Sequence, residues 1–171
     1  MIDDEQLKTV SGEEDAQAVY REVKACNDFV DFAWRFAFSN DSRVARNALW
    51  SLTKASDNEL AQLQGMLSEL IDLAMSTDYS PVRRLSLNII ERLRIGEEDI
   101  RTDFLDFCLE HMTDIEEQPG IQTLCMKLAY RMCGFYPELM GEFMRTVEAM
   151  QADFYKTAVK CLIRRVLNGK I

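Results

Sequence analysis

The 171-residue sequence contains few glycines and prolines, seven and three respectively, and no apolar run approaches 18 residues. The first scarcity, together with abundant leucine, alanine, methionine, arginine and glutamate, favours helix over strand. The second excludes a typical membrane-spanning helix. The opening Met-Ile-Asp-Asp-Glu is the reverse of the basic start of a signal peptide. These features predict an all-helical, cytoplasmic protein.

Residues that build catalytic and metal sites are also scarce. His111 is the only histidine, and no glycine-rich phosphate-binding loop is present. Cys108 and His111 are three residues apart and could form half a zinc site, but no second pair completes it. Cys108 falls in an apolar stripe, which favours a core thiol over a nucleophile. We therefore expect no catalytic residue, no metal and no cofactor.

The cysteines do not suggest a disulfide framework. Their number is odd, they are scattered, and no Cys-x-x-Cys pair occurs among Cys26, Cys108, Cys125, Cys133 and Cys161. Most of them fall at or beside apolar positions of the helical pattern. Reduced, packed cysteines are therefore predicted, as in a reducing compartment.

An amphipathic helix is predicted after residue 79. Asp78 or Ser80 can cap its start, Pro81 suits its first turn, and Gly96 would end it. Apolar or small residues then recur at three- and four-residue spacing, at Val82, Leu85, Ser86, Ile89, Ile90 and Leu93.

The same pattern recurs at intervals of 38, 39 and 33 residues. An apolar position is shared by Val44, Val82, Ile121 and Phe154. A small or narrow residue is shared by Ala48, Ser86, Cys125 and Ala158. Another apolar-periodic segment precedes each of these helices. The second such segment follows the capping candidate Asp57. The fourth follows Gly134, which would end the preceding helix, and has Pro137 in its first turn. The sequence thus predicts four helical pairs, at about 28–54, 57–95, 98–133 and 137–168, after an extra helix at about 13–26.

The turn before the second helix of pair two resembles the HEAT repeat signature, which has Asp, three residues, Val-Arg, two residues and Ala. Asp78, Val82 and Arg83 match this signature, and Ser86 stands at the Ala position. The resemblance implies an all-α fold, a right-handed α-α superhelix or α-solenoid of about four HEAT-like hairpins in one domain, and a scaffold function. Armadillo repeats and a non-repetitive helical bundle are the alternatives.

Positive charge is concentrated on the second helix of each pair. Segments 41–54, 80–94, 119–133 and 153–167 hold 13 basic and 3 acidic residues, whereas the rest of the chain is strongly acidic. In HEAT-like proteins these helices line the concave face. We therefore predict a concave basic surface that binds an acidic or phosphorylated protein segment. Its candidate residues are Arg46, Trp50, Lys54, Arg84, Arg92, Lys127, Arg131, Lys156, Lys160 and Arg164.

Several alternatives stay open at this point. The basic residues near helix C-termini could serve only to offset the helix dipole or to pair with nearby acids. Nucleic acid is a less favoured partner, because the chain carries a net charge of −9. Resemblance to HEAT-like DNA alkylation-repair glycosylases would require a carboxylate beside Trp50, for which Asp41 is only a neighbour in sequence. Met140, Phe143, Met144 and Met150 suggest an apolar end that could form a homodimer.

Overall fold

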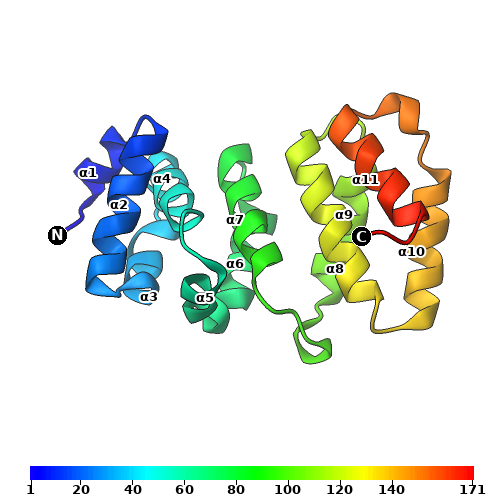
Figure 1. Ribbon diagram of the computed structural model, residues 1–171, viewed down its shortest axis with the longest axis horizontal. Helices are drawn as coiled ribbons and strands as arrows, with labels where there is room; N and C mark the ends of the chain where they lie inside the picture. Colours follow the sequence, from blue (N-terminus) through cyan, green and yellow to red (C-terminus); the bar gives the residue numbers. More distant parts are fainter. The chain divides into compact units, whose positions relative to one another are not determined.

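The computed structural model describes residues 1–171, which form helices joined by short turns, without a strand (Figure 1). The predicted all-α fold class is therefore confirmed. The chain divides into two compact units, residues 1–94 and 95–171, referred to here as unit 1 and unit 2. None of the helices combines the length and apolar character needed to cross a membrane.

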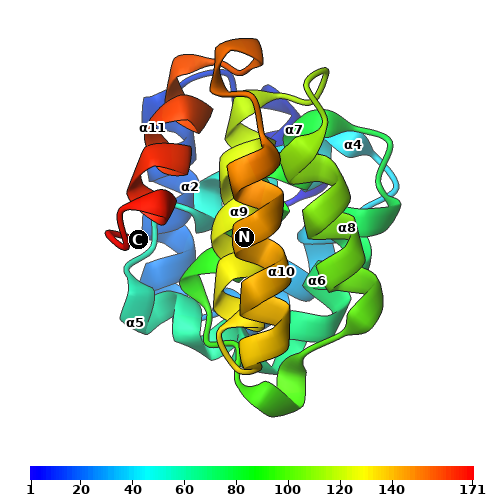
Figure 2. The ribbon, with the colours of Figure 1, turned by 90° about the vertical axis from the view of Figure 1, so that its right-hand side faces the viewer.

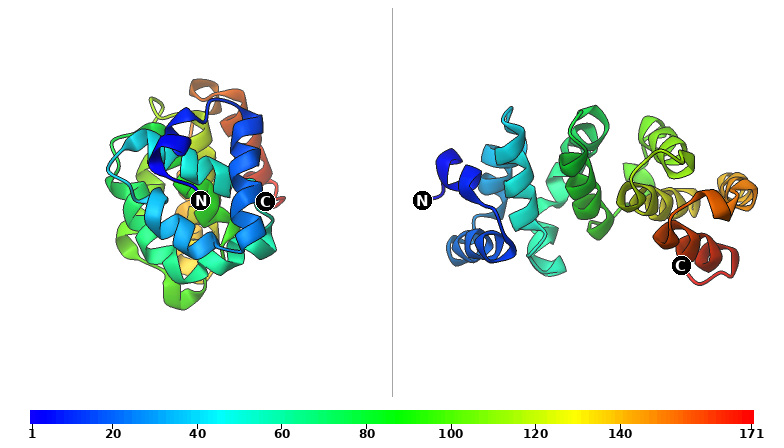
Figure 3. Two further views of the ribbon diagram at one scale, coloured as in Figure 1. Left: turned by 90° about the vertical axis from the view of Figure 1, so that its left-hand side faces the viewer. Right: turned by 90° about the horizontal axis from the view of Figure 1, so that it is seen from above.

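Unit 1 contains seven α-helices and two short helices of other types. In chain order they are α1 (Asp4–Thr9), α2 (Glu13–Cys26), α3 (Phe29–Phe32), the π-helix η1 (Ala33–Ala37), α4 (Ser42–Leu52), α5 (Asp57–Leu60), the 3-10 helix η2 (Ala61–Met66), α6 (Leu67–Ser76) and α7 (Ser80–Arg92). Helices α1 and α2, in blue, face the viewer in the left view of Figure 3, and both pack on α4. The bounds predicted for α2 are confirmed, whereas the short helix α1 was not predicted.

Unit 2 contains four α-helices and two 3-10 turns. They are η3 (Glu97–Asp99), α8 (Thr102–Thr113), α9 (Pro119–Cys133), α10 (Pro137–Ala149), η4 (Ala152–Phe154) and α11 (Thr157–Leu167). Helices α8, α10 and α11 all pack against α9, and α8, α9 and α10 are seen together in Figure 2. Helix α9 is therefore the centre of this unit, with nine buried residues.

The second helices of the four pairs begin at Ser42, Ser80, Pro119 and Thr157, which are 38, 39 and 38 residues apart. The predicted 33-residue step to the fourth helix is therefore wrong. Phe154 is 65% exposed in the 3-10 turn before α11, and Ala158 is exposed, whereas Val159 is fully buried. Val159 therefore takes the position of the buried residues Val44, Val82 and Ile121.

Some helix ends also differ from prediction. Ser56, not Asp57, caps α5, because its hydroxyl accepts the amide hydrogen of Glu59 while the Glu59 carboxylate accepts the amide hydrogen of Ser56. Tyr79 is the residue before α7, and no side chain caps that start. The helix ends at Arg92, four residues earlier than the predicted Gly96.

The cysteines divide into two groups. Cys108, Cys125 and Cys133 are buried in unit 2, as predicted, whereas Cys26 and Cys161 are exposed, and all five are free thiols. Burial, followed by a hydrogen bond to Cys125, raises the pKa of the Cys108 thiol well above its usual value. This thiol is therefore a core side chain and not an activated nucleophile.

Candidate partner-binding surface

Three predicted site residues form a stack at the C-terminal half of α4. Arg46 and Trp50 lie on one face of the helix, and Lys54 follows at the same four-residue spacing, in the turn just after the helix ends at Leu52. The Arg46 guanidinium lies 5.2 Å from the centre of the Trp50 ring, and the Lys54 ammonium lies 5.6 Å from it. Both distances allow a cation–π interaction. We call these three residues the α4 cluster.

The base of the α4 cluster is anchored by a buried amide. The Asn47 side chain is fully buried and donates hydrogen bonds to the carbonyl oxygens of Leu7 and Val10, at the C-terminal end of α1. Arg46 in turn donates a 3.0 Å hydrogen bond to the Asn47 side-chain oxygen. The short helix α1 therefore holds one end of the cluster in place.

The other end of the α4 cluster is an ion pair. Lys54 lies 2.7 Å from a carboxylate oxygen of Glu13, at the start of α2, and its side chain is only 17% exposed. The hydrogen bond from Lys54 is the main reason why the pKa of Glu13 is lowered. Lys54 is therefore partly neutralised, and Arg46 is the freer cation of the two.

Helix α7 packs beside α4 and carries arginines with two different roles. Arg84 is exposed and forms no ion pair. Arg92 donates to the carbonyl oxygens of Thr53 and Ala55 and pairs with Asp57 at 2.8 Å, which fixes the loop between α4 and α5. The predicted partner-binding residue Arg92 is thus engaged in a structural contact.

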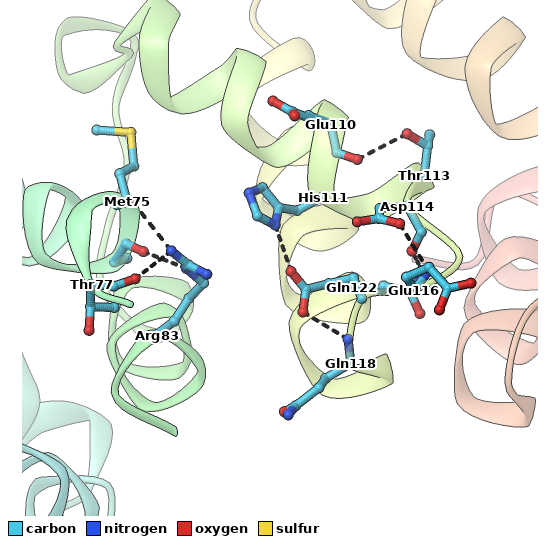
Figure 4. A network of polar contacts seen from close by, with 12 residues as sticks. Met75, Thr77, Arg83, Glu110, His111, Thr113, Asp114, Glu116, Gln118 and Gln122 are labelled. Atoms are coloured by element: carbon cyan, nitrogen blue, oxygen red, sulfur yellow. Dashed lines mark hydrogen bonds and ion pairs between the residues drawn. The ribbon is translucent and has the colours of Figure 1, made fainter. Parts of the chain in front are cut away.

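The neighbour of Arg84 in sequence is also engaged within unit 1. Arg83 donates to the carbonyl oxygens of Ala74, Met75 and Thr77 at the C-terminal end of α6 (Figure 4). These carbonyls have no partner within the helix, so the guanidinium serves as a C-terminal cap. Arg83 is therefore a structural residue, although it lies next to a predicted site residue.

The remaining predicted residues lie on α9 and α11, which pack together in unit 2, except for Lys156, which directly precedes α11. Lys127 and Arg131 on α9 are half-buried, Lys156 and Arg164 are exposed, and Lys160 lies 4.0 Å from Asp153. The corrected repeat alignment places Arg165 in the same position as Trp50 and Lys127. Arg165 is exposed, and the sequence analysis missed it because the 3-10 turn before α11 was counted as part of that helix.

Comparison with known families identifies the repeat. A HEAT repeat domain matches residues 4–170. This protein belongs to the HEAT repeat family. The armadillo and irregular-bundle alternatives are thereby set aside, and the α-solenoid class is confirmed. Neither a curated protein nor a solved structure gives a match to this HEAT repeat chain.

HEAT repeat domains are generally non-enzymatic and often mediate protein interactions. The glycosylase alternative needs a carboxylate beside Trp50. Asp41 instead caps the N-terminus of α4, accepting hydrogen bonds from the amides of Arg43 and Val44. Trp50 is nine positions further along the chain, about 14 Å along the helix axis. The carboxylate at the Trp50 end of α4 is Glu13, which pairs with Lys54.

The single histidine has a packing role in unit 2 of this HEAT repeat protein. His111 (Figure 4) lies 2.7 Å from a Glu117 carboxylate oxygen. The centre of its ring lies 4.0 Å from that of the Phe107 ring, with the two planes inclined by 32°. The second Glu117 oxygen accepts a hydrogen bond from the Gln118 amide, just before α9. His111 therefore ties α8 to the loop before α9, and the nearby Cys108 is fully buried.

Proposed function

We propose that this HEAT repeat protein is a non-catalytic scaffold that binds an acidic or phosphorylated protein segment through its second helices. In unit 1 the binding surface consists of the α4 cluster and Arg84. In unit 2 it consists of Lys127, Arg131, Lys156, Lys160 and Arg164, to which the corrected alignment adds Arg165. Arg92 contributes positive charge to this surface but is held by the loop before α5.

The observation that carries the proposal is an ordered aromatic side chain close to arginines that form no ion pair. Trp50 is held between Arg46 and Lys54, and Arg84 on the adjacent helix is exposed without an ion pair. Carboxylates or phosphates of an acidic segment can bind these arginines, while the indole ring supplies apolar contact area at low entropic cost. Arginine and tryptophan are also the residues most often found at the energetic centre of protein interfaces.

A protein partner is favoured over nucleic acid because of the charge outside this surface. Apart from the four second-helix segments, the chain holds 26 acidic and 7 basic residues. These would repel a polyanion that extended beyond the basic helices. A cytoplasmic location is part of the same proposal and is supported by five free thiols.

The test measures binding of a fluorescein-labelled hexaglutamate peptide by fluorescence anisotropy at low salt. The Arg46→Gln/Arg84→Gln double variant should bind about five- to thirtyfold more weakly, since each cation contributes about 0.5–1 kcal/mol. The matched control is Arg21→Gln/Arg145→Gln, which removes two exposed arginines from α2 and α10. Equal loss in both double variants would mean that binding follows net charge and would contradict the proposed surface.

A second arm separates the scaffold from the glycosylase alternative. The wild-type protein is incubated with alkylated DNA, and release of the modified base is measured. The scaffold proposal predicts no release above background, whereas release that depends on Trp50 would contradict it.

The sequence predicted a homodimer through the C-terminal end, but less apolar surface is exposed there than the sequence suggested. Phe143 and Met150 are buried within unit 2, and Met140 and Met144 are half-buried. Light scattering at high protein concentration tests this prediction, which a mass of 19.8 kDa would contradict.

A further inference from the structure

Unit 1 contains a pocket built by η1 and α6 and not by the basic helices α4 and α7. Its volume is about 390 Å³, and it is lined by Trp34, Phe38, Glu69, Asp72, Leu73 and Ser76. We call it the aromatic–acidic pocket. It combines exposed rings with carboxylates, whereas the α4 cluster combines a ring with cations.

The aromatic wall is open to solvent. Trp34 is 48% exposed, and its ring lies 5.3 Å from that of Phe38, centre to centre, with the planes inclined by 31°. Both residues come from the segment that includes the π-helix η1, whose Ala33, Phe36 and Ala37 are buried. Single π-helical turns occur frequently at functional sites. The exposed half of the indole ring offers apolar area that a ligand can cover.

The acidic wall includes a carboxylate oxygen without a partner. Oε2 of Glu69 is shielded from solvent and accepts no hydrogen bond. A shielded acceptor of this kind loses its hydration without compensation, and a cation paired with the same carboxylate would offset this cost. Residues 57–79 include five acidic residues and no basic one, and the nearby Arg83 guanidinium is bound to backbone carbonyls at the C-terminal end of α6. Of these five, Asp57 and Glu59 are paired with Arg92 and Lys24 respectively, and Asp72 also has a partner.

We propose that the aromatic–acidic pocket binds an arginine side chain of a protein partner. A guanidinium can lie flat on the Trp34 ring while its N–H groups donate to the Glu69 carboxylate. The same protein already shows the first half of this geometry, since the Arg46 guanidinium lies 5.2 Å from the Trp50 ring centre. Arginine fits better than lysine because a planar fork can stack and donate at the same time. This site is independent of the proposed basic surface.

The test follows the indole N–H signals in a nitrogen–proton NMR spectrum during titration with N-acetyl-L-arginine methylamide. The chain has two tryptophans, so Trp50 serves as an internal control. The Trp34 signal should shift with a dissociation constant in the millimolar range, as expected for one side chain. The Trp50 signal should stay in place, because Arg46 and Lys54 already cover its ring.

Two further titrations of the wild-type protein separate the effect of the probe's charge from that of its shape. The citrulline counterpart of the probe has the same shape without the charge and should not shift the Trp34 signal. The lysine counterpart should bind several-fold more weakly than the arginine probe. Equal shifts with citrulline would overturn a cation site, and equal or tighter binding of lysine would overturn the assignment to arginine.

Variants identify the acidic partner. Glu69→Gln should weaken arginine binding about tenfold, as expected for loss of a charged hydrogen bond. Asp78→Asn, which removes an exposed carboxylate in the same unit, should leave binding unchanged. Unchanged binding in Glu69→Gln would overturn the proposal, as would a Trp34 signal that does not move at about 50 mM probe, far above a millimolar dissociation constant.

Discussion

Unit 1 presents two regions in which charged side chains behave in opposite ways. At the helix ends, Arg83 and Arg92 donate to backbone carbonyl oxygens, and Glu59 accepts from a backbone amide. In the middle of the α4 and α7 faces, Arg46 and Arg84 contact no carboxylate. Charges of the first kind complete the backbone hydrogen bonding of the fold, whereas charges of the second kind are available to a partner. The number of basic residues on a helix therefore overstates its capacity to bind anions.

The largest expected effect is the loss of stability when a carbonyl-bound arginine, rather than an unpaired one, is replaced. Arg92→Met should lower the free energy of unfolding by about 2–4 kcal/mol, because carbonyls of Thr53 and Ala55 lose a charged donor. Arg84→Met should change it by less than about 0.5 kcal/mol, as for most exposed sites. Urea unfolding followed by tryptophan fluorescence measures both, since both tryptophans lie in unit 1. Similar losses of unfolding free energy in the two variants would contradict the distinction between structural and partner-accessible arginines.

A conservative replacement sharpens the same comparison. Arg92→Lys keeps the charge but cannot reach three acceptors with a fixed fork, so it should recover less than half of the lost stability.

A smaller effect is expected from Glu59, which holds the start of α5. Hydrogen bonds from the Ser56 amide and then from Lys24 lower the pKa of the Glu59 carboxyl to about 2, well below its ordinary value. A depressed carboxyl pKa stabilises the fold fully above about pH 4.5 and loses that contribution as the pH falls towards 2. Urea midpoints of unit 1 should therefore drop over this range, and the drop should be shallower in Glu59→Gln. Parallel pH profiles for both proteins would contradict this assignment.

The smallest effect is expected at Lys54, which lies between the two kinds of charge. Lys54→Met removes the ion pair with Glu13 but keeps the side-chain length over the Trp50 ring, so stability should fall by only about 0.2–1 kcal/mol. The same urea experiment measures it. A loss as large as that of Arg92→Met would show that Lys54 belongs with the structural charges.

Sequence periodicity predicted the long helices because each buries an apolar stripe over three or more turns. It failed where the local pattern is short or is set by contacts elsewhere. Helix α1 has only six residues and depends on Asn47, about 40 positions later in the chain. The fourth repeat was misaligned because the 3-10 turn at Phe154 has helix-like spacing while its side chain faces solvent.

The candidate site shows the same limit. Helical phase correctly grouped Arg46, Trp50 and Lys54, since neighbours at four-residue spacing meet on any helix. It did not reveal that Arg92 binds carbonyls at Thr53 and Ala55, because those contacts span 39 and 37 residues. The aromatic–acidic pocket escaped notice for a similar reason, since Trp34 and Glu69 belong to different repeats.

The positions of the free cysteines allow the protein to be labelled with spectroscopic probes. One exposed cysteine lies in each unit, Cys26 in unit 1 and Cys161 in unit 2, while the other three are buried. Brief treatment of the native protein with a maleimide reagent should therefore label these two positions selectively. A donor–acceptor dye pair, or two spin labels, would then report the separation of the units without any engineered cysteine, and would follow its change as a partner peptide is added.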